Sequence, residues 1–202
     1  MKTQRSLSSG VQFERFFLKQ INQLARLGCL EEIATILKLQ QFPVLAKARE
    51  TGISEGNIPF IPVIPPAYRS IYDQMNSVFP NGHRGFTELN PTAIVDVEKT
   101  PNRPYYIFDV DFGTSLLGRP PRRARQSIKH RGRFPLTAAE IISVALLAKP
   151  PPGHFLHAPG SRYGSANKIL TLYQVGASPR LGWVLSGEGH PEWGTPSCAR
   201  RF

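Results

Sequence analysis

The chain has 202 residues, of which 41% are hydrophobic, and it carries a formal net charge of +11. This length and apolar content are enough for one domain with a buried core, and they exclude an intrinsically disordered chain. We expect neither a membrane-spanning helix nor a secretory signal, because no long apolar stretch occurs, and Cys29 and Cys198 are too few for a disulfide framework. The composition therefore favours a cytoplasmic protein.

The first 50 residues predict two helices. Apolar side chains recur at steps of three and four residues over 13–27, and Gly28 is a typical residue just beyond a helix end. A second helical pattern covers residues 30–48 and is interrupted by Pro43. These two helices are expected to pack as a hairpin.

Three segments predict strands. NIPFIPVIPP, residues 57–66, is apolar, but its prolines cannot donate ladder hydrogen bonds, so it is expected at a sheet edge. YYIFDVDFG, residues 105–113, is the clearest strand because it is rich in β-branched and aromatic residues. Residues 168–187 predict a β-hairpin that turns at GASPR.

The remaining segments predict helices and loops. Residues 67–78 resemble a short helix, and residues 137–149 predict a helix whose capping box is Thr137 and Glu140. Residues 150–164, rich in proline and glycine, predict a loop.

The predicted fold class is α+β, with an N-terminal helical hairpin packed on an antiparallel or mixed β-sheet in a single compact domain. A flexible N-terminus is expected over residues 1–12 and the helical hairpin over residues 13–48. The sheet-containing core is expected over residues 56–202 and includes a basic loop at residues 119–133.

The positive charge is concentrated in the second half of the chain. Residues 1–118 hold 12 Lys and Arg against 11 Asp and Glu, whereas residues 119–202 hold 13 against 3. A basic block without acidic residues attracts polyanions such as nucleic acid by counterion release. The sequence predicts non-catalytic polyanion binding through Arg119, Arg122, Arg123, Arg125, Lys129, Arg131 and Arg133.

The alternative to polyanion binding is a solvated loop that contributes only solubility. Aromatic residues of the same half are available as stacking partners for bases, namely Tyr163, Trp183, Trp193 and Phe202. No known sequence-reading motif is present. Membrane-surface binding would need an amphipathic helix, against which Pro120, Pro121 and Gly132 argue.

An enzyme is the competing class, with a thiol as one candidate for its chemistry. Cys198 and His190 are close in sequence, and a histidine lowers the pKa of a neighbouring thiol. Ser197 or Arg200 would then hold an oxyanion. The alternative, which we favour, is a buried cysteine that completes the core.

Two sets of residues are candidates for a metal site, although we predict none. His154 and His157 form H-x-x-H and would need His190 or Cys198 as further ligands. Asp109 and Asp111, two residues apart on one face of a strand, would suit Mg²⁺ with Glu98 or Asp96. Paired aspartates at a strand end also cap the following turn, and we favour that role. No cofactor is identified.

The segment GSRYG places Ser161 and Arg162 between glycines. Arg162 can bind a carboxylate or phosphate of a ligand, or it can pair with Asp109 or Asp111 to join the strand to this segment. The enzyme hypothesis gathers Asp109, Asp111, Arg162, His190 and Cys198 in one site. A scaffold protein is the third class, and in it these residues only stabilise the fold.

A series of motifs resembles an uncharacterised bacterial family, domain-of-unknown-function family 5701. They occur in the order GISEGNIPFIPVI, YYIFDVDFG, GRFPLT, GSRYG, SPRLGWVLSG and the closing H…G…SCARR, over residues 13–202. The resemblance implies a shared fold and no activity. Tyr163 and Val184 stand where the family pattern has cysteines, which argues against a site built on several thiols.

Overall fold

The N-terminal segment forms three helices in the computed structural model, which describes residues 5–202 and their side chains from residue 12. The segment predicted as the second helix forms two separate helices. The chain bends between them at Gln40, and Pro43 lies in the first turn of the later helix. The first helix begins at Arg5, within the segment expected to be flexible, and residues 1–4 lie outside the described residues. The helices are α1 (Arg5–Arg26), α2 (Glu31–Leu39) and α3 (Gln41–Thr51).

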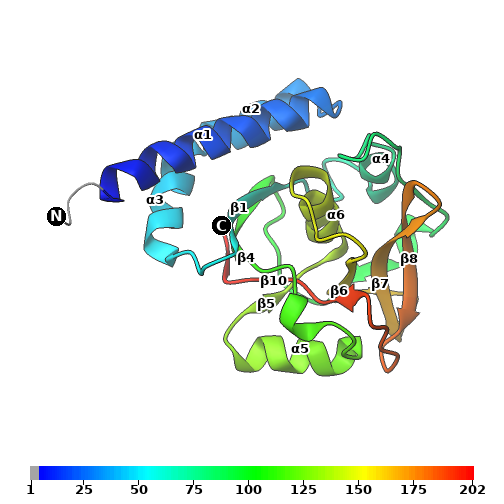
Figure 1. Ribbon diagram of the computed structural model, residues 1–202. Helices are drawn as coiled ribbons and strands as arrows, with labels where there is room; N and C mark the ends of the chain where they lie inside the picture. The colour runs from blue at the N-terminus through cyan, green and yellow to red at the C-terminus, as the bar shows by residue number, and fades with distance from the viewer. Residues whose placement is uncertain (1–4) are drawn as a thin grey trace.

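A three-stranded antiparallel sheet follows, in the order β1 (Ile58–Val63), β4 (Tyr105–Val110) and β11 (Arg200–Arg201). β1 is an edge strand, as the sequence predicts, because its prolines leave it without donors for a second neighbour. β4 is buried along its whole length and lies in the middle. The last strand brings the C-terminus beside β4 (Figure 1).

The second sheet is mixed and has the order β2-β8-β7-β6-β3, with β9 also paired to β6. The predicted hairpin is confirmed as β7 and β8, which pair antiparallel over eight residue pairs. The β2–β8 and β6–β9 pairs are parallel. The strands are β2 (Phe86–Thr87), β3 (Ile94–Asp96), β6 (Phe155–Tyr163), β7 (Ser165–Val175), β8 (Ser178–Leu185) and β9 (Trp193–Gly194).

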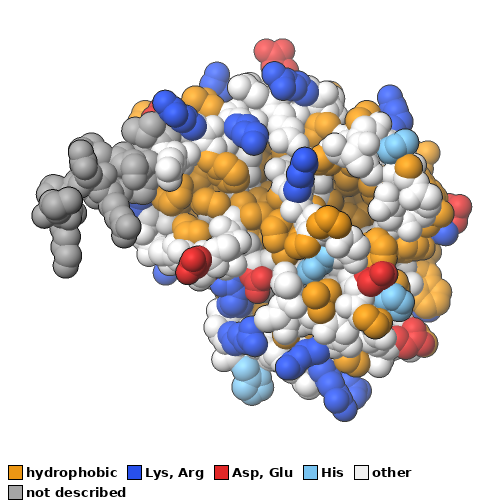
Figure 2. All heavy atoms as spheres, viewed as in Figure 1, with side chains coloured by type: hydrophobic (Ala, Val, Ile, Leu, Met, Phe, Trp, Pro, Cys, Tyr) orange, Lys and Arg blue, Asp and Glu red, His pale blue; other side chains and the backbone are white. Residues whose placement is uncertain are grey.

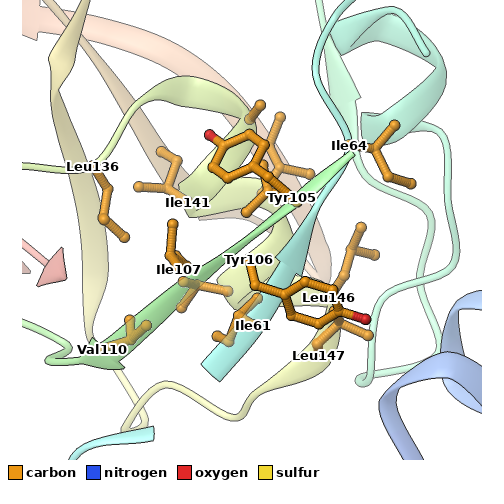
Figure 3. Close-up of a cluster of buried hydrophobic side chains, with 14 of the residues drawn as sticks. Ile61, Ile64, Tyr105, Tyr106, Ile107, Val110, Leu136, Ile141, Leu146 and Leu147 are labelled. Atoms are coloured by element: carbon orange, nitrogen blue, oxygen red, sulfur yellow. The ribbon is translucent and has the colours of Figure 1, made fainter. Parts of the chain in front are cut away.

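Helix α6 (Ala138–Leu147) lies between the two sheets and contacts β1, β6 and β7 (Figure 1). One half of its predicted capping box is present, because the Thr137 backbone N–H donates to the Glu140 carboxylate at 2.8 Å. The Thr137 hydroxyl has no hydrogen-bond partner among the described residues. Figure 3 shows the core that α6 forms with β1 and β4, in which Ile61, Tyr106 and Ile141 are fully buried. This packing confirms the α+β class in one compact domain.

Small elements complete the fold. The helix predicted at residues 67–78 is shorter and starts after Ser70, whose side chain accepts a bond from the Asp73 backbone. A two-stranded sheet pairs Phe134 and Pro135 with Cys198 and Ser197 of the C-terminal segment. These elements are α4 (Ile71–Met75), η1 (Pro91–Ala93), η2 (Thr114–Leu116), β5 (Phe134–Pro135) and β10 (Ser197–Cys198).

The basic segment is not a loop, because it contains helix α5 (Pro121–His130). Pro121 occupies the first turn, where a backbone N–H has no helical partner and the fixed proline φ suits a helix start. Gly132 lies beyond the last turn with a φ of +66°. Both residues therefore delimit a helix, and the prediction that they exclude an amphipathic helix is wrong.

The proline-rich segment 150–164 is also not a loop, since β6 occupies most of it. The register with β7 shifts between Ala158 and Arg162, so Pro159 lies in a bulge where no ladder donor is needed. The Gly160 N–H donates to Leu136, and a Cβ at Gly160 would lie 2.6 Å from the Leu136 carbonyl oxygen. The bulge and this close approach explain why a strand carries both residues. No helix within residues 5–202 is long and apolar enough to cross a membrane.

Candidate functional site

Helix α5 presents a basic surface at one end of the molecule. Its inner side chains Pro121, Ala124 and Ile128 are buried and recur at helical spacing, so the opposite side faces solvent. The backbone N–H of Arg122 donates to the Ser186 carbonyl at 3.0 Å and holds the helix start against the end of β8. Lys and Arg side chains gather along the lower edge in Figure 2, where α5 lies in Figure 1.

Three of the seven predicted binding residues hold internal ion pairs. Arg125 and Lys129, one helical turn apart, both contact the Glu98 carboxylate, at 2.6 and 2.9 Å. Burial opposes the charged form of Glu98, but Lys129 and Arg125 hold its pKa below the ordinary value. One carboxylate thus compensates two cations, and the pair ties α5 to the segment after β3.

Arg133 is the third, and it is a structural residue. Its guanidinium bonds to the Asp109 carboxylate and carbonyl and to Ser197. Burial disfavours the charged carboxylate, but bonds from Arg133, Ser54 and Asn57 keep the pKa of Asp109 below its ordinary value. Asp109 has a φ of +50°, a strained value that this network fixes.

The other four, Arg119, Arg122, Arg123 and Arg131, are exposed. None of them makes a salt bridge within residues 5–202. Arg119 and Arg131 make long 3.4 Å bonds to the hydroxyls of Ser127 and Ser115. These guanidinium groups remain available to an anion.

The four predicted stacking aromatics lie in different environments. Trp183 is 41% exposed, with the Lys168 ammonium 4.2 Å from its ring centroid, and it precedes the α5 contact at Ser186 by three residues. Phe202 is also exposed, whereas Tyr163 and Trp193 are half-buried. Trp183 is therefore an exposed aromatic residue on the strand whose end contacts α5.

Ser161 and Arg162 lie on β6 rather than in a loop. Ser161 is buried, accepts a bond from the Ala138 backbone at the start of α6 and donates to Asp96. Arg162 donates to the carbonyls of Pro159 and Ser161. Burial lowers the pKa of Arg162, and the charge of the neighbouring Arg125 lowers it further. Arg162 is therefore a third cation near Glu98, beside Arg125 and Lys129.

The residues of the enzyme hypothesis have separate surroundings. Asp109 pairs with Arg133 and not with Arg162, while Asp111 accepts a bond from the Gly113 backbone and caps the turn. His190 is exposed and lies against Trp193, with 5.1 Å between the ring centroids. Cys198 is fully buried in the core, where burial raises the pKa of its thiol. In the described part of the chain these residues form no shared cleft.

The two histidines of H-x-x-H point to different partners. His154 donates from Nε2 to the Phe112 carbonyl at 2.8 Å, and His157 is hydrogen-bonded to Thr171 at 2.9 Å. Burial lowers the pKa of both, to about 3 for His157. Over residues 5–202, no group of three or more His, Cys, Asp or Glu side chains is arranged to hold a metal ion.

Sequence reasoning did not find the role of Arg201. Its guanidinium forms two bonds to Glu140, at 2.6 and 2.8 Å, and Glu140 is fully buried. Tyr105 donates to the same carboxylate at 2.8 Å. The capping box identifies Glu140, but nothing in the local pattern identifies a partner 61 residues away.

Comparison with curated proteins and with solved structures finds no match. The model of a family of unknown function, DUF5701, matches residues 24–202, nearly the whole chain. This match agrees with the resemblance carried by the six ordered motifs. The chain therefore belongs to the family of unknown function DUF5701.

Proposed function

We propose that the protein binds nucleic acid through the outer side of α5 and makes phosphate contacts without reading base sequence. The supporting observation is that α5 is anchored by buried residues while Arg119, Arg122, Arg123 and Arg131 stay exposed and outside the ion pairs. When a phosphate binds, arginines on a fixed helix lose less conformational entropy than arginines on a flexible loop. Arginine is well suited to bidentate phosphate contacts.

The internal pairs support a division of roles among the basic residues. Arg133 fastens β4, while Arg125 and Lys129 fasten α5 at Glu98. With one carboxylate between Arg125, Lys129 and the nearby Arg162, this region also stays positive. The phosphate contacts are therefore assigned mainly to the exposed arginines, and the paired ones position the helix.

Salt-dependent binding tests the proposal. Fluorescence anisotropy with generic single- and double-stranded DNA and RNA is measured at several salt concentrations for the wild type and for Arg122→Ala/Arg123→Ala. Each lost phosphate contact lowers the slope of log K against log salt by about 0.9 on duplex DNA, so we expect a decrease of about 1.8. Arg122→Lys/Arg123→Lys keeps the charge and is expected to keep the slope.

The matched control is Arg15→Ala/Lys19→Ala, which removes the same charge from exposed positions on α1. This control is expected to bind almost as tightly as the wild type. Equal weakening by both double variants would show that net charge alone attracts the nucleic acid. Absence of binding at low salt would refute the proposal.

A further inference from the structure

A pocket of about 370 Å³ opens between the C-terminal end of α6 and the β6–β7 strands. It lies away from α5, none of whose residues line it. In Figure 2, hydrophobic side chains gather over this part of the molecule, which α6 and the β7–β8 hairpin occupy in Figure 1. The volume lies within the range of small-molecule sites.

The pocket walls are apolar and held in place by the fold. Phe79, Leu156 and Leu172 are each at most 5% exposed, and the two leucines are paired partners on β6 and β7. Phe155 and Tyr173 add two rings at an interplanar angle of 80°. Since these residues are already packed, an apolar ligand would gain burial without ordering the walls.

One side of the pocket carries a positive charge. Lys149 directly follows the end of α6 and is the single Lys, Arg, Asp or Glu among the lining residues. It makes no salt bridge in the described chain. His154 also lines the pocket, and burial lowers the pKa of its imidazole, which disfavours a second positive charge there. A ligand with an anionic group beside Lys149 and an apolar body is complementary to this arrangement.

We propose that this pocket binds a small amphipathic carboxylate, with its hydrocarbon or aromatic body against Phe155, Leu172 and Tyr173 and its carboxylate beside Lys149. A water molecule occupies ~30 Å³ of liquid volume, so the pocket has room for about a dozen non-hydrogen atoms. Decanoate has this size and is the probe. The site is independent of the nucleic-acid surface at α5.

Trp193 supplies the readout because Tyr173 stacks on it with 6.3 Å between ring centroids. In a Trp183→Phe background Trp193 is the only tryptophan, and its fluorescence is followed during titration with decanoate below its micellar concentration. Saturable binding is expected. Decanol is expected to bind more weakly, and decyltrimethylammonium more weakly still.

Two variants separate the charge from the apolar wall. Lys149→Gln is expected to weaken decanoate binding about threefold, as for an exposed ion pair, and to remove the preference over decanol. Ala145→Leu, which narrows the pocket with a good helix former, is expected to weaken both probes. Lys38→Gln, on α2, is the control and leaves both unchanged.

Failure of decanoate to saturate would overturn the proposal. A wild-type protein that binds decanol as tightly as decanoate would overturn the assignment of the anionic group. Unchanged binding by Ala145→Leu would place the probe elsewhere. Far-ultraviolet circular dichroism of each variant confirms that the fold is retained.

Discussion

Acid should destabilise the protein through His157. The side chain is fully buried, bonds to Thr171 from Nδ1 and lies 5.1 Å from the Trp193 ring centroid. Its Nε2 has no hydrogen-bond partner among the described residues. Burial lowers the pKa of His157 to about 3, because a charged imidazole there would lose its hydration.

The sign and size of the effect follow from the two pKa values. The unfolded chain takes up a proton as the pH falls through about 6.5, whereas the folded chain resists protonation until about pH 3. Between these values the unfolded state binds more protons than the folded state. The free energy of unfolding therefore decreases as the pH is lowered. At about 1.4 kcal/mol per pH unit, the loss is about 2 kcal/mol between pH 6.5 and pH 5.

Urea unfolding at pH 7.5 and pH 5.0 measures this loss. His157→Gln keeps an amide that can bond to Thr171 but cannot titrate, and each protein is compared with its own value at pH 7.5. Effects of other titrating groups are common to both proteins and cancel. The wild type should lose about 2 kcal/mol more than His157→Gln over this interval. An equal loss in both would refute the reasoning.

Three further substitutions test the packing of the fold. Arg201→Met leaves the buried Glu140 carboxylate without its cation and should lower the free energy of unfolding by about 3–5 kcal/mol, measured in urea. Gly113→Ala places a Cβ against the Thr195 backbone at a positive φ and should lower Tm by several degrees more than Gly82→Ala, whose Cβ would meet open space. Ile128→Ala should cost about 2–4 kcal/mol, and a change within 0.5 kcal/mol would show that α5 is not anchored by this residue.

Local patterns were sufficient where one element determines its own structure. The apolar run of β4, the capping box of α6 and the apolar spacing of α1 each lie within about twenty residues, and all three elements formed. The β7–β8 hairpin likewise needs only two neighbouring segments and a short turn. In these cases the spacing of the hydrophobic residues and the residues of the turns both predict the element that is observed.

The sequence prediction was wrong at two prolines, because the effect of a proline depends on its position within a helix or strand and not only on its presence. Pro121 ends no helix because it starts one, and Pro159 breaks no strand because β6 bulges at that point. Whether a proline lies at a helix start or in a bulge depends on neighbours such as Ser186 and Leu136, which are distant in sequence. A prediction made from one segment of the sequence does not include these distant neighbours.

The basic surface shows the same limit. Sequence reasoning could identify the cluster of seven cations, but the ones that are paired depend on Glu98 and Asp109, which lie 24 to 31 residues away along the chain. The triple Arg122, Arg123 and Arg125 looks uniform in sequence. The fold makes Arg125 a structural residue and leaves the other two to solvent.

The distribution of carboxylates explains why a basic surface persists on a folded protein. Residues 119–202 contain only Glu140, Glu188 and Glu192 as acidic residues. Glu140 is buried and already paired with Arg201, so it does not screen the arginines outside. The fold thus uses its buried carboxylates to fix the cations that position α5, β4 and β11, and the remaining positive charge lies on the surface. Replacing a buried carboxylate would loosen the fold, whereas adding an acidic residue to the outer side of α5 would lower the positive charge of the proposed binding surface and leave the core intact.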